Sequence, residues 1–324
     1  MKKITQFALT LTGCAVLAAC STTPAKVDNS SRAQQLAQQF IIVDTHIDVP
    51  YRLHKDWEDV TVATKRGEFD YPRARQGGLN APFMSIYIPA SYERTGGGYQ
   101  LANQLIDNME ALVGRAPDKF AMAYTTADVE QQFGSAKISL ALGMENGTPI
   151  EGKLENLKHF YDRGIRYITL AHSESNHISD SSYDLRRRWN GLSPFGKELV
   201  EAMNNIGMMI DISHVSDAAF YQTVELSKVP VIASHSSLRS YTPGFERNMD
   251  DDMIRALAKM VAWYKLTSAR LLLHKWPTSM VPCAKLRLNK PVCQTMTPLK
   301  LNFVKSTLTP SPRWRQFLII LTTS

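Results

Sequence analysis

Acidic residues are missing from the last part of this chain of 324 residues. Residues 261–324 contain ten Lys or Arg and no Asp or Glu, so they more than account for the net charge of +7. Residues 1–260 carry 27 basic and 30 acidic groups and are slightly acidic. Because nucleic acid binding depends on a basic surface, we exclude a nucleic acid partner.

Cysteine is scarce as well. The four cysteines are Cys14, Cys20, Cys283 and Cys293, and none lies between residues 21 and 282. The main body therefore has neither a disulfide framework nor a thiolate metal site. The apolar fraction of 44% excludes a disordered or fibrous chain, and the length of the main body suits one large domain.

The first residues have the pattern of an export signal. Two lysines precede an apolar run at 7–19 that is too short to span a bilayer, and Leu-Ala-Ala-Cys at 17–20 resembles the lipobox of bacterial lipoproteins. We expect a signal peptide at 1–19, a lipid on Cys20 and a polar tether at 20–37. Since Ser21 rather than Asp follows the cysteine, we expect the protein on the outer membrane of a bacterial envelope, facing the periplasm.

Short apolar runs alternate with amphipathic stretches through the main body. The predicted strands are 40–46, 83–88, 138–144, 167–171, 208–212 and 229–233. The predicted helices are 100–113, 150–163, 194–205, 216–227 and 250–259. This alternation predicts a parallel α/β fold, and the repeated units favour a (β/α)8 TIM-like barrel. The alternative is an open doubly wound sheet, but no G-x-G-x-x-G motif follows the first strand.

Histidines and carboxylates stand at the ends of five predicted strands. In chain order they are His46 with Asp48, Glu145, His172, His214 and His235. The carboxyl ends of parallel barrel strands share one rim, so the fold would bring these side chains into one cavity. Imidazole and carboxylate without thiolate are typical of catalytic zinc, and one glutamate between two half-sites can bridge two ions.

The segments around these residues resemble the zinc-dependent membrane (renal-type) dipeptidases. The similar segments cover about residues 38–259 and include Asp-Thr-His-Ile-Asp at 44–48, the Glu145 segment, and 167–173, 190–196, 209–216, 234–237 and 247–251. The resemblance implies an eight-stranded barrel of the metal-dependent hydrolase type. It also implies two Zn²⁺ ions and small dipeptides as substrates, and it is compatible with a homodimer.

The resemblance also implies a metal-binding role for five residues. His46, Asp48 and Glu145 would hold one zinc ion. Glu145, His214 and His235 would hold the other, so that Glu145 bridges the pair. A water between the two ions would become acidic enough to attack the amide carbon.

Four further residues receive supporting roles. By resemblance, His172 is the catalytic histidine that faces the scissile group of the substrate, and it could donate to the developing oxyanion. Arg247 would bind the substrate carboxylate through its planar guanidinium. Asp44 and Asp211 precede metal ligands, and we expect them to orient the imidazoles.

The end of the chain departs from the family pattern. The family carries a further aspartate after strand eight, but no Asp follows Asp252 here, and the expected seventh strand is not recognisable. Codons compatible with residues 260–268, read in another frame, can encode the missing family strand, Gly-Gly-Val-Val-Gln-Ile-Asn-Phe. We therefore expect a frameshift near Lys259–Met260 and an out-of-frame basic tail at 260–324. Strands seven and eight would then be missing or replaced, and activity impaired.

Two alternatives to a dipeptidase remain open on the sequence. One is another amidohydrolase acting on cyclic amides or lactones, although those enzymes usually open with His-x-His and this chain has His46-Ile47-Asp48. The other is an inactive, metal-binding lipoprotein, because the last strands are altered.

Overall fold

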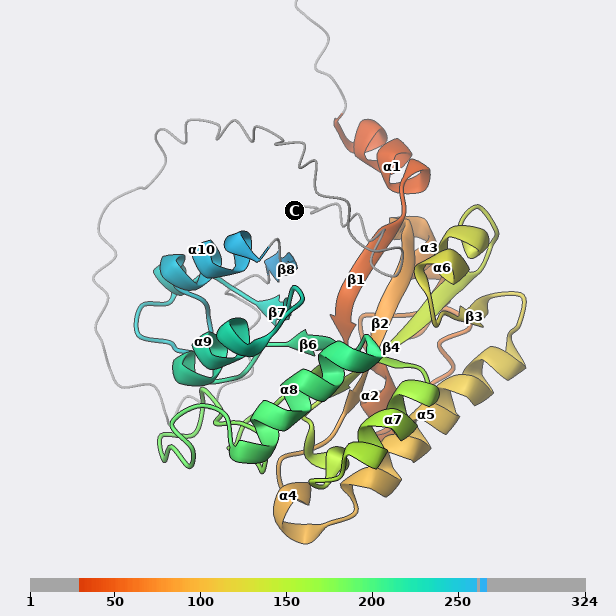
Figure 1. Ribbon diagram of the computed structural model, residues 1–324. Coiled ribbons are helices and arrows are strands. Elements are labelled where there is room, and N and C mark those ends of the chain that lie inside the picture. Colours follow the sequence, from red (N-terminus) through yellow and green to blue (C-terminus); the bar gives the residue numbers. More distant parts are fainter. Residues whose placement is uncertain (1–28, 261–262, 267–324) are drawn as a thin grey trace, which may run out of the picture.

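Parallel strands form one strongly curved sheet in the computed structural model (Figure 1), which describes residues 29–260 and 263–266, the last four by backbone alone. The sheet order is β1-β2-β4-β5-β6-β7-β8, and a short strand, β3, pairs with β4 beside this path. The strand bounds are β1 Ile42–Ile47, β2 Leu79–Tyr87, β3 Phe120–Met122, β4 Ile138–Glu145, β5 Ile165–Thr169, β6 Met209–Asp211, β7 Ile232–Ser236 and β8 Trp263–Leu266. Because β1 also contacts β7, the sheet forms a nearly closed barrel.

Helices cover the outside of the barrel (Figure 1). They are α1 Asn29–Gln39, α2 Val49–Lys55, α3 Tyr71–Gly77, α4 Tyr92–Thr95, α5 Gly98–Arg115, α6 Thr126–Gln132, α7 Leu154–Asp162, α8 Pro194–Ile206, α9 Asp217–Leu226 and α10 Asp251–Lys259, with 3-10 turns at Thr148–Ile150 and Arg239–Tyr241. The hydroxyls of Ser193 and Ser216 cap α8 and α9 by accepting from the backbone amides of Gly196 and Ala219. No helix in the described ranges has the length and apolar character needed to cross a membrane.

Tyr167 of β5 fills the interior of the barrel. Its side chain is fully buried and packs with Ala141 of the adjacent strand β4 and with Phe83 of β2, one strand further along the sheet. The ring lies directly over the backbone of β4 at Gly143, where an added Cβ would come within 2.1 Å of the ring. Glycine at this position is therefore what allows a tyrosine to occupy the centre of the barrel.

All six predicted strands and all five predicted helices of the main body are confirmed, with shifted ends. The sixth strand, for example, begins at Ile232 rather than at residue 229. Within the tether predicted for 20–37, the residues from Asn29 onward belong to helix α1, Asn29–Gln39. Alanine and glutamine are good helix formers, and they dominate this stretch. The predicted signal peptide at 1–19 and Cys20 lie outside the described residues.

A strand occupies the place where the sequence indicated a lost one. Trp263–Leu266 forms β8, which pairs in parallel with β7 through Ile232↔Trp263 and Ala233↔Tyr264. Tryptophan and tyrosine favour strands, and the edge of β7 offers unpaired backbone groups. The seventh strand is thus replaced rather than missing. An eighth barrel strand is not found among the described residues, so the predicted fold, an incomplete α/β barrel, is confirmed.

Candidate metal centre

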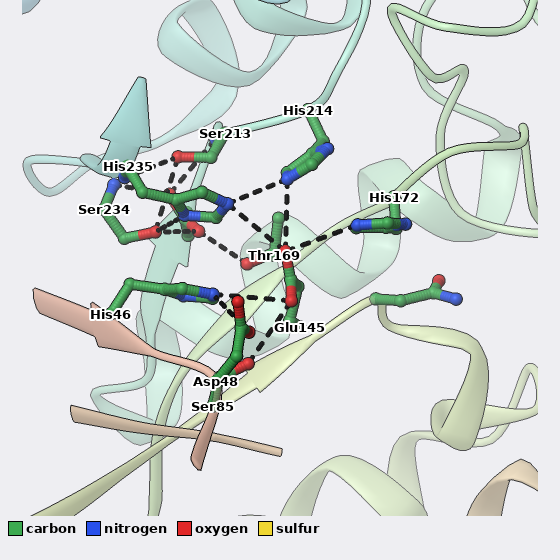
Figure 2. Close-up of polar contacts among 12 residues, drawn as sticks. His46, Asp48, Ser85, Glu145, Thr169, His172, Ser213, His214, Ser234 and His235 are labelled. Atoms are coloured by element: carbon green, nitrogen blue, oxygen red, sulfur yellow. Dashed lines mark hydrogen bonds and ion pairs between the residues drawn. The ribbon is translucent and has the colours of Figure 1, made fainter. Parts of the chain in front are cut away.

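Four histidines surround one buried carboxylate at the carboxyl ends of the strands (Figure 2). Glu145 ends β4 and is 4% exposed. Its Oε1 atom lies 3.1 Å from Nε2 of His214, 3.2 Å from Nε2 of His235 and 3.5 Å from Nε2 of His172. Its Oε2 atom lies 3.4 Å from Nε2 of His46. One carboxylate therefore faces four imidazole nitrogens.

The same atoms form two groups that could hold a metal ion. One is His46, Glu145 and His235, and the other is Glu145, His172 and His214. Glu145 is shared by both, as predicted. Their membership differs from the predicted ligand sets, because His235 groups with His46, and His172 takes a place beside His214. Asp48 is outside both groups, although its Oδ1 atom lies 3.3 Å from Nε2 of His46.

Charges at the centre are set by burial and by near neighbours. Burial raises the pKa of Glu145, but the nearby charges of His46 and His172 outweigh this and hold it well below the usual range. Burial lowers the pKa of His46, whereas Glu145 and Asp48 raise it, and the result is about 10. Without a metal ion, the centre is thus an ionised carboxylate facing a cationic imidazole.

The other two ligand histidines remain neutral. Burial, together with the charge of Arg247, holds the pKa of His214 well below its usual range. Burial and the charge of His46 lower the pKa of His235 to about 4. A neutral imidazole is the form that binds a metal ion, so these two side chains are ready for metal without losing a proton.

His214 has an unusual backbone conformation. Its φ of 72° lies in the left-handed region, which is costly for a residue with a side chain. The backbone amide and hydroxyl of Ser182 both donate to the carbonyl of His214, at 2.8 and 2.9 Å. The loop after β5 therefore holds the segment after β6 in the conformation that directs this imidazole toward Glu145.

The two predicted supporting aspartates lie next to the ligand segments. Asp44 accepts a hydrogen bond from the backbone amide of His46 at 3.0 Å. Asp211 acts through an intermediate, because Ser234 Oγ lies 2.6 Å from its carboxylate and 2.7 Å from Nδ1 of His235. The residue at Nδ1 of His46 is Tyr167, which the sequence analysis missed.

A cavity of about 600 Å³ opens onto the centre. Its lining comprises His46, Asp48, Tyr51, Arg52, Tyr87, Glu145, His172, Ser173, Tyr183, His214, His235 and Arg247. Arg247 is 3% exposed, donates to Ser236 Oγ at 2.8 Å and to the carbonyl of His235 at 2.9 Å, and so is fixed beside the metal-binding strand. The volume suits a small-molecule ligand.

The family model for membrane dipeptidases, peptidase family M19, matches residues 30–274. The chain belongs to this family. The matched range includes strand β8, which lies beyond the point where acidic residues end. M19 members are metal-dependent dipeptidases, and the site residues described above lie within the match.

Individual M19 relatives agree with this assignment. An uncharacterized dipeptidase of Schizosaccharomyces pombe is 30% identical over 239 residues, which cover 69% of this chain and 58% of that protein. Dipeptidase 3 of Mus musculus is 34% identical over 237 residues, which cover 70% of this chain and 47% of that protein. The chain thus spans about half the length of the curated relatives it matches.

Solved structures share the barrel. The probable dipeptidase PvdM from Pseudomonas aeruginosa superposes with a TM-score of 0.67 at 24% identity and covers 73% of this chain and 62% of its own. A metallo peptidase from Rhodobacter sphaeroides, liganded with a phosphinate mimic of the dipeptide L-Ala-D-Ala, gives a TM-score of 0.63 at 22% identity, with 70% and 73% coverage. At these identities the likeness shows the fold.

Proposed function

We propose that this M19 chain is a zinc-dependent dipeptidase that hydrolyses the amide bond of small L-dipeptides. The observation that carries the proposal is the position of Glu145, whose two oxygens face the Nε2 atoms of four histidines at the floor of a small cavity. No cysteine lies among the described residues, and a nitrogen and oxygen donor set is the one that catalytic zinc prefers.

Two ions bridged by Glu145 are the occupancy that we favour. His46 and Asp48 would complete one coordination sphere, while His214 and His235 would complete the other. The Nε2 atoms of His214 and His235 lie 2.8 Å apart and 3.1 and 3.2 Å from Oε1 of Glu145, and this convergence of donor atoms supports a shared ion. Zn²⁺ bound here would supply water activation and carbonyl polarisation.

His172 and Arg247 are the residues that we assign to the substrate. Burial lowers the pKa of His172, so its neutral ring can donate one hydrogen bond to an amide oxygen as negative charge develops there. The fixed guanidinium of Arg247 offers positive charge to a free carboxylate. A ligand of the class bound by the Rhodobacter sphaeroides neighbour, a dipeptide mimic, is small enough for the cavity.

The experiment is zinc analysis and hydrolysis by the purified full chain against a panel of dipeptides, cyclic amides and lactones. We expect bound zinc and dipeptide hydrolysis that a chelator abolishes. Hydrolysis of cyclic amides or lactones alone would show that the protein is another kind of amidohydrolase. Bound zinc without any hydrolysis would leave a metal-binding lipoprotein.

His172→Asn separates a substrate contact from a metal ligand. Loss of one transition-state hydrogen bond costs about 10²–10³-fold in turnover, and we expect this loss with full zinc content. The matched control is His54→Asn on the exposed face of α2, which should change neither quantity. Loss of zinc in His172→Asn would place this residue among the ligands, as the observed grouping with His214 allows.

We propose further that the reading frame changes near Lys259–Met260 and impairs this chain. The acid-free composition of residues 261–324 and the codons permitted at 260–268 support the change, while the family match through residue 274 and strand β8 weigh against it. Resequencing the DNA of codons 255–265 decides the matter. A frame-restored chain should then hydrolyse dipeptides at least about 100-fold faster, since it regains general acid–base help. Equal activity would overturn the proposal.

A lipid anchor on Cys20 is our proposal for the location of the protein, on the outer membrane facing the periplasm. The lipobox pattern at 17–20 supports it. Changing Cys20→Ser should release the protein from the membrane fraction or block removal of residues 1–19. Unchanged fractionation and mass would show that Cys20 carries no lipid.

A further inference from the structure

We propose that Tyr167 is a positioning residue of the metal centre, whose buried hydroxyl fixes the tautomer of His46 so that Nε2 presents its lone pair to the metal. The inference rests on the proposed metal-binding function and deepens it. It assigns a role to a residue at the centre of the barrel, on the opposite side of His46 from Glu145.

The direction of the hydrogen bonds follows from the partners of the Tyr167 hydroxyl. This oxygen lies 2.8 Å from Nδ1 of His46 and 3.1 Å from the carbonyl oxygen of Thr45. A carbonyl oxygen can only accept, so the single hydroxyl proton goes to Thr45. The hydroxyl then accepts from Nδ1–H of His46. In the neutral ring this leaves Nε2 without a proton, facing the carboxylates of Glu145 and Asp48.

A second relay imposes the same tautomer on His235. The hydroxyl of Ser234 lies 2.6 Å from the carboxylate of Asp211 and 2.7 Å from Nδ1 of His235. An ionised carboxylate can only accept, so Ser234 donates to Asp211 and accepts from Nδ1–H.

The remaining two imidazoles have no such relay. Nδ1 of His172 and Nδ1 of His214 are buried and have no hydrogen-bond partner within the described part of the chain. The centre thus combines two imidazoles of fixed tautomer with two that are held only by packing. A partner on the distal nitrogen of a ligand histidine typically strengthens metal binding by about 10–100-fold, so His46 and His235 are the preset ligands.

The phenol ring is held where the relay needs it. Tyr167 is 0% exposed, its ring centroid lies 5.3 Å from that of Phe83, and it rests on the bare backbone of Gly143. Burial raises the pKa of Tyr167 well above its usual range, so the hydroxyl keeps its proton. A phenylalanine at 167 would fill the same space and remove only the oxygen.

The test uses the full chain and the variant Tyr167→Phe, with zinc affinity measured by competition against a chromophoric chelator. We expect affinity to fall by about 10–100-fold, as for other outer partners of metal ligands. The matched control is Tyr71→Phe, which removes a hydroxyl that donates to the carbonyl of Ala136 at 2.8 Å, far from the centre. Unchanged zinc affinity in a folded Tyr167→Phe protein would overturn the inference.

Nitrogen-15 NMR of the histidine rings provides a readout that does not depend on bound metal or on the variant. Because the pKa of His46 is about 10, the metal-free wild-type chain is measured at a higher pH, where the ring is neutral and should carry its one hydrogen on Nδ1. A neutral His46 protonated on Nε2 alone would sink the inference even if Tyr167→Phe failed to fold. Should the wild-type chain bind no zinc, the proposed function fails, whereas this spectrum still decides the role of Tyr167.

Discussion

The two sides of the barrel hold their strands together by different means. On one side, β2 and β4 pair over consecutive positions from Phe83↔Ala141 to Tyr87↔Glu145, and both strands are almost completely buried. On the other side, β6 has three residues and pairs with β7 only at Asp211↔Ile232. A regular backbone ladder therefore positions β2 and β4, whereas β6 and β7 need other contacts to hold them together.

The carboxylate of Asp211 joins these strands by side-chain hydrogen bonds, where few backbone ladder bonds are present. It is fully buried and accepts from the hydroxyl of Thr169 on β5 at 2.5 Å. It also accepts from the amide of Ser213, and from the amide and hydroxyl of Ser234 on β7. One side chain thus joins three strands. Glu145 stands on ladder-supported backbone, whereas His214 and His235 follow or belong to strands that this carboxylate joins.

Removing that carboxylate should have the largest effect. Asp211→Ala leaves two backbone amides and two hydroxyls without an acceptor, and each buried orphan costs about 1–3 kcal/mol. We expect a loss of about 4 kcal/mol in the free energy of unfolding, measured in urea, together with weaker zinc binding. A loss below about 1 kcal/mol would show that β6 and β7 have other support.

The next prediction compares ligands from the two sides. Glu145→Gln should reduce zinc content for both ions, because the shared carboxylate is lost, whereas His235→Ala should weaken one ion. Each lost ion corresponds to at least about a 100-fold fall in affinity, or about 2.7 kcal/mol. Glu225→Gln, on the exposed face of α9, is the matched control. Two tightly bound zinc ions in Glu145→Gln would count against bridging.

A buried aspartate on the ladder-supported side provides the contrasting case. Asp70 caps α3 by accepting from the backbone amide of Arg73 at 2.9 Å, and it also accepts from the amide of Thr64. Asp70→Ala should lower the free energy of unfolding by about 1–2 kcal/mol, as loss of a helix cap does, with zinc affinity unchanged. If zinc affinity falls as it does in Asp211→Ala, the two sides are not independent.

The smallest effect concerns a contact between loops of the two sides. Burial raises the pKa of Glu93, but hydrogen bonds and charge from His177 outweigh this and hold it below its usual value. A depressed folded pKa means that the stability from Glu93 is fully present above its unfolded pKa and is lost as pH falls through the folded one. The stability difference between wild type and Glu93→Gln should therefore be under about 1 kcal/mol at pH 7 and shrink as pH falls below the ordinary glutamate pKa of 4.5 toward the lower folded one. A difference that does not shrink in acid would contradict this assignment.

The sequence was most informative where function depends on strand ends. The placement of His46, Glu145, His214 and His235 on one rim follows from strand alternation alone, and the structure brings their atoms within 3.5 Å of one carboxylate. The grouping of atoms into His46, Glu145 and His235 and into Glu145, His172 and His214 did not follow, because it depends on ring rotation within a cluster that spans the whole barrel. The order of strands can be read from the local sequence, whereas the rotation of each imidazole ring depends on residues far away in the chain.

Contacts across the barrel interior could not be predicted from the chain. Tyr167 lies 121 positions from His46, and nothing near either residue indicates that they meet. The alternation of side chains along β5 gave one indication. Tyr167 lies two residues before Thr169, so both side chains point to the same side of the strand. Strand β8 escaped prediction for a different reason: its pairing uses backbone groups at the edge of β7, which any segment with strand propensity can satisfy.

Thr45 joins the beginning and the later part of the barrel directly. Its hydroxyl donates to the carbonyl of Ser234 at 2.5 Å, across 189 positions of sequence, and both residues adjoin metal-facing histidines. In the described part of the chain, β8 does not pair with β1, so the barrel is not closed by backbone pairing. The Thr45–Ser234 hydrogen bond joins its two ends in the interior, next to the histidines. The distance between His46 and His235 is therefore fixed by a contact that does not involve the residues after β7. A change in the residues after β7 should therefore leave the spacing of these two histidines in place.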